Sequence, residues 1–204
     1  MRYHEYFKAF AFCLVWLFAV ITSHNSTKAQ ARRYEIICSQ NLWSASFDSV
    51  MSQIGVTEKT GNNDGEQIDK YLRPVGLRRV AYCYAGQYWG FYVAAGGNKS
   101  KVPLLNSALA SAAFNYSKIN GWLSPIVHPQ PLDLIFWKFS RTPFGHAARI
   151  IAVNRAGWIE TIEFNTTSGN TGNQRDGGGV WRRKRNIRYP LGRMGLLGFI
   201  GRKK

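Results

Sequence analysis

Cysteine and acidic residues are both scarce in this chain of 204 residues. Three Cys are too few for a small domain held together by a disulfide framework. The 11 Asp and Glu stand against 27 Lys and Arg, which gives a formal net charge of +16. With only 7 Pro and no regular glycine period, the chain is neither collagen-like nor of low complexity.

What the chain does contain is typical of a folded protein. Apolar residues make up 45% and aromatic residues 14%, which is enough to build a packed core and excludes an intrinsically disordered chain. The length predicts one globular domain, or one domain with a short appendage. The excess of cations predicts an anionic partner. Nucleic acid, acidic lipid and acidic polymer all remain open on composition alone.

The longest uncharged apolar run covers residues 9–22. Its 14 residues are fewer than the roughly 20 that a membrane-spanning helix needs. Arg2 and Lys8 precede the run, and residues 29–31 (Ala-Gln-Ala) offer a small-x-small cleavage site. We therefore expect residues 1–31 to be a signal peptide that exports the protein to the periplasm, the cell wall or the outside. An uncleaved membrane anchor is the alternative.

The mature chain, residues 32–204, is expected to form one domain because it has no internal repeat and no long linker. Loss of residues 1–31 removes three cations and one acid, which leaves a net charge of +14. Two thiols remain, Cys38 and Cys83. An oxidising compartment permits a disulfide between them. A free, buried thiol is nevertheless our expectation for Cys38.

Hydrophobic periodicity predicts helices in the first half of the domain and strands in the second. Apolar residues spaced by three and four predict a helix over 40–54, and the apolar run 83–95 predicts another, with a strand as its alternative. Asp64 is expected to cap a short helix, and one more helix is expected near 105–114. The expected strands are 132–139, 146–153, 157–164, 179–187 and 196–200. Helices followed by strands indicate an α+β fold, here with N-terminal helices packed on a small antiparallel sheet.

Cys83 is the first candidate for chemistry, because it stands at the start of the predicted helix 83–95. The positive end of the helix dipole favours a thiolate at that position, and the thiolate is the nucleophilic form. A cysteine among aromatic residues is, taken alone, better explained as a small buried hydrophobe. The histidines of the mature chain therefore decide how Cys83 is interpreted.

His146 begins one of two predicted strands that are joined by a short turn at residues 154–157. The resulting hairpin places His146 opposite about residues 163–165. Glu163 and Asn165 share a face because side chains two apart along a strand point to the same side. A thiol, a base and a polar group that orients the base form the arrangement of nucleophilic catalysis. A strand-end histidine and a solvated strand edge remain the simpler interpretations of each residue taken singly.

Other candidates for chemistry are weaker. His128 is flanked by prolines in a predicted loop, which is less suited to hold a base in a fixed position. The chain contains neither Cys-x-x-Cys nor His-Glu-x-x-His. We therefore expect no metal and no other cofactor.

Several short motifs together resemble the CHAP domain, a papain-like family of cysteine- and histidine-dependent amidohydrolases and peptidases that act on bacterial peptidoglycan. The resemblance covers roughly residues 50–200. The motifs are the segment 54–65 with its Asn-Asn-Asp-Gly turn, residues 71–77, Ala81-Tyr82-Cys83, Gly145-His146, the Glu-x-Asn-Thr stretch in 161–166, and the glycine-rich turn and basic strand in 177–183.

This resemblance implies a papain-like fold and a role for each candidate residue. Cys83 would be the nucleophile, His146 the general base and later the acid, and Glu163 the residue that orients the imidazole. Asn165 would complete the site, either on the histidine or by donating to the oxyanion. The chain departs from the family pattern just after the cysteine, where Gly86 is expected to weaken the first helical turns by up to about 1 kcal/mol relative to Ala.

The resemblance also implies the partners. The substrate would be peptidoglycan, cleaved as an N-acetylmuramoyl-L-alanine amidase or an endopeptidase, by a protein that acts as a monomer. The basic clusters 182–185 and 202–204 could hold the protein near an anionic cell-envelope surface. We expect no specific nucleic-acid partner, because the chain has an export signal and no nucleic-acid-binding motif. The alternative function is that of an exported, catalytically inactive wall-binding protein of the same fold.

Overall fold

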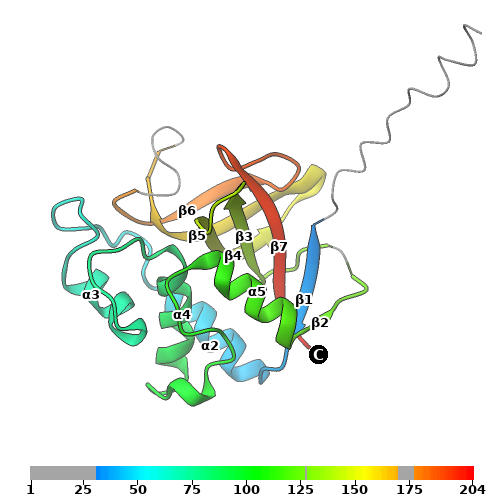
Figure 1. Ribbon diagram of the computed structural model, residues 1–204, viewed down its shortest axis with the longest axis horizontal. Helices are drawn as coiled ribbons and strands as arrows, with labels where there is room; N and C mark the ends of the chain where they lie inside the picture. The colour runs from blue at the N-terminus through cyan, green and yellow to red at the C-terminus, as the bar shows by residue number, and fades with distance from the viewer. Residues whose placement is uncertain (1–30, 127, 170–176) are drawn as a thin grey trace, which may run out of the picture. The chain divides into compact units, whose positions relative to one another are not determined.

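The computed structural model describes residues 31–126, 128–169 and 177–204, which form an α+β fold (Figure 1). The expected signal peptide lies outside this part of the chain except for its last residue. Within it the α-helices are α2 (Gln40–Met51), α3 (Glu66–Leu72), α4 (Cys83–Ala94) and α5 (Ala110–Asn120). The strands are β1 (Arg32–Ile36), β2 (Trp122–Leu123), β3 (Leu134–Phe139), β4 (Gly145–Val153), β5 (Trp158–Thr166), β6 (Gly179–Asn186) and β7 (Met194–Arg202). Residues 31–204 form one compact unit.

All the described strands belong to one mixed sheet in the order β2-β1-β7-β3-β4-β5-β6. Strand β1 runs parallel to β7, and the other neighbouring strands are antiparallel. The strands expected from residue 132 onward are confirmed as β3 to β7. The expectation of a small antiparallel sheet is wrong, because the sheet has seven strands and one parallel pair.

The sheet is larger than expected because β1 and β2 extend it beyond β7. Residues 32–36 read as too polar for a buried strand, with two arginines and a glutamate among five residues. Arg33 is nevertheless buried, since its guanidinium donates two hydrogen bonds to the carboxylate of Asp133, at 2.7 and 3.0 Å. A charge can be buried when it is paired and hydrogen-bonded in this way. The partner is 100 residues away in the sequence.

The helices at 40–54 and 83–95 are confirmed as α2 and α4. The helix expected near 105–114 begins later, at Ala110. The hydroxyl of Ser107 accepts a hydrogen bond from the Leu109 N–H at 2.9 Å, which forms a local turn just before the helix. No helix in the described ranges combines the length and the apolar character of a membrane span.

The short helix α3 forms where expected, but its cap is not Asp64. The capping position is Gly65, and its φ of 124° lies in a region that favours glycine. Asp64 instead accepts hydrogen bonds from the N–H and the hydroxyl of Thr60, at 2.9 and 2.8 Å. The carboxylate therefore stabilises the turn that precedes the helix.

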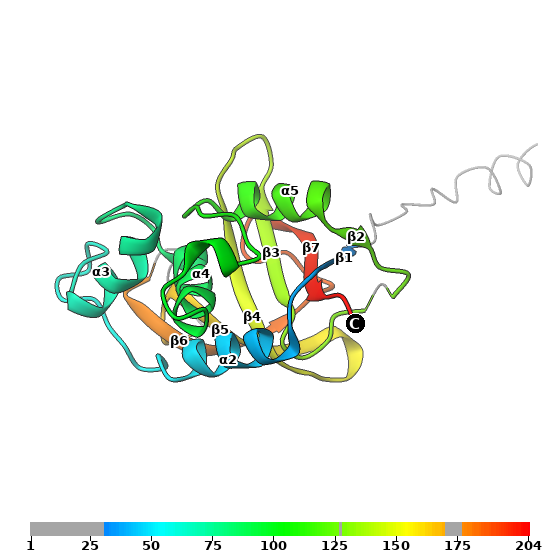
Figure 2. The same cartoon turned by 90° about the horizontal axis from the view of Figure 1, so that it is seen from below.

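Helices α2 and α4 lie side by side in both views, while α5 lies apart from α2 and packs on β1 and β3 (Figures 1 and 2). Strand β5 shows how alternation divides the side chains between the two faces of the sheet. Ile162 and Phe164 pack with Ala85 of α4 in one hydrophobic cluster. Thr161 and Glu163, on the alternate positions, face the other way and are fully buried. This second face carries the polar groups described next.

Candidate active site

Cys83 is the first residue of α4, as its position in the sequence predicted. The capping residue Tyr82 makes no side-chain hydrogen bond to the helix, so the positive end of the helix dipole acts on the thiol. The sulfur is 3.9 Å from the carbonyl oxygen of Gly145, and the residue is only 3% exposed. The thiol therefore lies against the start of β4.

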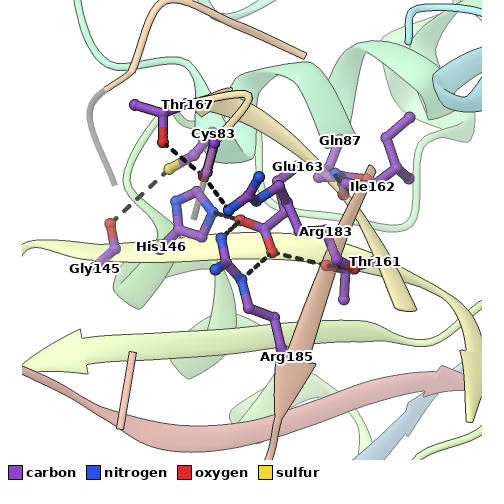
Figure 3. Close-up of polar contacts among 11 residues, drawn as sticks. Cys83, Gln87, Gly145, His146, Thr161, Ile162, Glu163, Thr167, Arg183 and Arg185 are labelled. Atoms are coloured by element: carbon purple, nitrogen blue, oxygen red, sulfur yellow. Dashed lines mark hydrogen bonds and ion pairs between the residues drawn. The ribbon is translucent and has the colours of Figure 1, made fainter. Parts of the chain in front are cut away.

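His146 is the second residue of β4 and is fully buried. A Cβ at the preceding Gly145 would lie 2.2 Å from the Trp137 carbonyl oxygen, so only glycine lets β4 approach β3 this closely. The imidazole Nε2 is 3.1 Å from Glu163 Oε2. Among the described residues Nδ1 has no hydrogen-bond partner. Figure 3 shows the ring between the sulfur of Cys83 and the carboxylate of Glu163.

Glu163 is buried and accepts hydrogen bonds from three side chains. Arg185 donates twice, from Nε to Oε1 at 2.7 Å and from Nη2 to Oε2 at 2.6 Å. The Thr161 hydroxyl donates to Oε1 at 2.7 Å. With the imidazole of His146 this makes four hydrogen bonds, which is about the full accepting capacity of an ionised carboxylate. Glu163 is therefore held as an anion behind the ring.

The pKa values of the three titratable groups are shifted in directions that favour charge. Burial raises the pKa of the Glu163 carboxyl, but the hydrogen bonds from Arg185 and His146 outweigh it and lower the pKa to about 2. Burial lowers the pKa of the His146 imidazole, but the neighbouring Cys83 and Glu163 raise it to about 9. Burial raises the pKa of the Cys83 thiol, yet the neighbouring His146 and its charge bring it below its ordinary value.

The result is a pair that is a thiolate and an imidazolium over a range of pH. This range extends from the lowered pKa of Cys83 up to about 9, where His146 loses its proton. An ionised carboxylate accepts the Nε2 proton of the ring, so Nδ1 is the nitrogen that faces the sulfur. Such a pair provides a nucleophile and a proton donor side by side (Figure 3).

Asn165 is fully buried near the end of β5, two residues after Glu163. It adopts a φ of 56° at a bulge, where the pairing of β5 with β6 shifts between Glu163 and Thr166. Its carbonyl oxygen accepts a hydrogen bond from the Gly177 N–H at 3.1 Å. The bulge therefore turns the chain directly after Glu163.

The remaining sequence candidates lie elsewhere. His128 is exposed in the segment between β2 and β3. Cys38 is a free, half-buried thiol whose Sγ contacts the Ser39 carbonyl oxygen at 3.4 Å, and Cys83 is also free. The pairing of the two thiols that export would permit is absent from this structure.

The sequence interpretation missed Arg185 and Thr161. Arg185 stood in the basic cluster 182–185, which was interpreted as one cationic surface. Alternation divides that cluster, since Arg183 and Arg185 point inward while Arg182 and Lys184 are exposed. The two-residue period of the strand is the signal that could have found Arg185. Thr161 could have been found by the same rule, two residues before Glu163.

Comparisons with known proteins give no independent assignment. No protein-family model, no curated protein and no solved structure matches the chain.

Proposed function

We propose that this protein is an exported cysteine hydrolase of bacterial peptidoglycan with a papain-like CHAP fold. The observation that carries the proposal is the position of His146, between Cys83 and a carboxylate that four hydrogen bonds keep ionised. The choice of substrate rests on the motif resemblance over roughly residues 50–200. The α+β architecture is compatible with that resemblance.

The proposed reaction begins with the Cys83 thiolate. The sulfur attacks the carbonyl carbon of a scissile amide, a C–S bond forms, and the π electrons of the carbonyl move to its oxygen. Backbone N–H groups at the start of α4 and the amide of Asn165 are the proposed donors to that oxyanion. His146 then gives its Nδ1 proton to the leaving nitrogen, the C–N bond breaks, and a thioester remains.

Water completes the cycle. The neutral imidazole of His146 takes a proton from a water molecule while the water oxygen attacks the thioester carbon. The C–S bond breaks, the product leaves as a carboxylic acid, and the thiolate–imidazolium pair returns. Throughout these steps Glu163 fixes the ring and stabilises its positive charge, as the third member of such triads does.

A zymogram on purified cell walls tests the proposal. We expect clearing by the wild-type protein, loss of clearing in Cys83→Ala, and retention in the matched control Cys38→Ala, which removes the other described thiol. Mass spectrometry of the released fragments then identifies the bond by its new termini. Equal clearing by Cys83→Ala contradicts the proposal. Binding to walls with no released fragment favours the alternative, a catalytically inactive wall-binding protein.

A further inference from the structure

The free edge of the sheet carries a group of exposed apolar side chains. Trp122 and Leu123, the two residues of β2, are 46% and 59% exposed, and Ile119 just before them is 80% exposed. Ile126 and Ile37 are 45% and 69% exposed. We call these five residues the edge patch. Single exposed apolar residues are ordinary, but a group of this kind marks an interaction surface.

The edge patch joins segments that are distant in the sequence. Strand β2 pairs with β1, with Trp122 opposite Glu35. The Lys203 N–H donates to the Ile36 carbonyl oxygen at 2.8 Å, and its Nζ lies 3.7 Å from the centroid of the Trp122 ring. Figures 1 and 2 both show β1, β2 and the end of β7 together, at the end of α5.

Positive charge surrounds the patch. The three segments that form this edge are residues 31–37, 116–126 and 198–204, and they contain a single acidic residue, Glu35. That carboxylate is already paired with Arg33, at 2.5 Å. The cations of the three segments are Arg32, Arg33, Lys118, Arg202, Lys203 and Lys204. Because Arg33 is buried on Asp133 and Glu35, the charge that remains at this edge is that of the other five cations and is positive.

We propose that the edge patch docks this domain on the surface of an anionic phospholipid bilayer. Tryptophan prefers the interface between headgroups and acyl chains, and lysine can bury its stem there while its ammonium group reaches the phosphates. The contact of Lys203 with Trp122 places both groups at one point of the edge. Leu123 and the isoleucines supply the apolar area that inserts.

Two other occupants fit less well. A second copy could pair along β2, but this strand is only two residues long and both copies would bring the same cations to the contact. A wall polysaccharide would need hydrogen-bonding groups, whereas the edge patch offers mainly aliphatic side chains. Both occupants are outcomes of the experiment below.

Lysine acetylation footprinting of the full chain, read by mass spectrometry, tests the proposal. The protein is mixed with vesicles of phosphatidylcholine alone or of phosphatidylcholine with phosphatidylglycerol. We expect Lys118, Lys203 and Lys204 to be acetylated several-fold more slowly on the anionic vesicles only. Lys70 belongs to α3 and Lys59 precedes this helix, which lies at the end of the fold away from β2 (Figures 1 and 2). The acetylation rates of these two lysines should not change.

Two sets of variants make the experiment specific. Trp122→Ser with Leu123→Ser should abolish the protection of Lys203, while Trp158→Ser, at an equally exposed tryptophan (48%), should not. Lys203→Glu with Lys204→Glu tests the charges without replacing any residue of β2, and should abolish the protection of Lys118. Unchanged protection in Trp122→Ser with Leu123→Ser, or in Lys203→Glu with Lys204→Glu, overturns the proposal.

The alternative occupants give different results. Protection that appears without vesicles and grows with protein concentration indicates a second copy. Protection by purified cell walls but not by anionic vesicles indicates a wall polymer. Either result overturns membrane docking. None of these measurements uses catalysis, so membrane docking and hydrolysis succeed or fail separately.

Discussion

The ring of Phe164 occupies the space that a side chain at position 86 would need. A Cβ at Gly86 would lie 2.2 Å from Phe164 Cδ1, so α4 rests directly on β5. Cys83 is three residues before this contact, and Glu163 is the neighbour of Phe164. The closeness of the helix and the strand therefore helps to fix the distance between the thiol and the group that orients its base.

Gly86→Ala should lower both stability and activity. Alanine favours the helix by up to about 1 kcal/mol, but overpacking against Phe164 costs about 1–3 kcal/mol and moves α4 away from β5. Thermal unfolding and wall clearing measure the two effects. The control is Gly195→Ala, because nothing lies within 4 Å of a Cβ at that position. If the two variants are equally stable, the contact with Phe164 does not position α4.

Arg185 should act as a positioning residue that keeps Glu163 ionised. Arg185→Lys keeps the charge but loses the bidentate hydrogen bonds to Glu163, and Arg185→Gln loses both the charge and these hydrogen bonds. We expect kcat to fall in that order with little change in KM, and the acid limb of the pH profile to move to higher pH. Arg182→Gln, at an exposed arginine on the same strand, is the control. Equal losses in Lys and Gln variants would indicate a purely structural role.

Glu163 should also make the free energy of unfolding depend on pH in the acidic range. Its pKa is about 2 in the folded protein and 4.5 ordinarily, so its contribution is complete above pH 4.5 and is lost as the pH falls toward 2. The contribution is on the order of 3 kcal/mol. Urea unfolding across this range should show a weaker pH dependence in Glu163→Gln than in the wild type. Identical pH dependence in both proteins contradicts the buried anion.

Local patterns predicted the parts of the fold that depend on neighbours in the sequence. The turn at 154–157 predicted the β4–β5 hairpin, and the observed pairing of Ala148 with Glu163 is the register that brings residues 146 and 163 together. The apolar run after Cys83 likewise predicted where α4 begins.

The parts that could not be predicted depend on charges that are buried by distant partners. Strand β1 was missed because Arg33 is neutralised by Asp133, a contact that no local pattern reveals. Arg185 is a different case, because the two-residue period of β6 could have separated it from the exposed Arg182 and Lys184, although its partner carboxylate on the next strand could not be foreseen. Composition alone treats both arginines as surface charge, and the paired strands show that both are held by buried carboxylates.

The electrostatic coupling of Cys83 to His146 can be measured without any substrate. The ultraviolet absorbance of the thiolate, taken as the difference between the wild type and Cys83→Ala, gives the titration midpoint of this sulfur. We expect a midpoint below the ordinary value of 9.0, and a midpoint above 9.0 in His146→Gln because burial then acts without the imidazolium. A wild-type midpoint at or above 9.0 that His146→Gln leaves unchanged would contradict the thiolate–imidazolium pair.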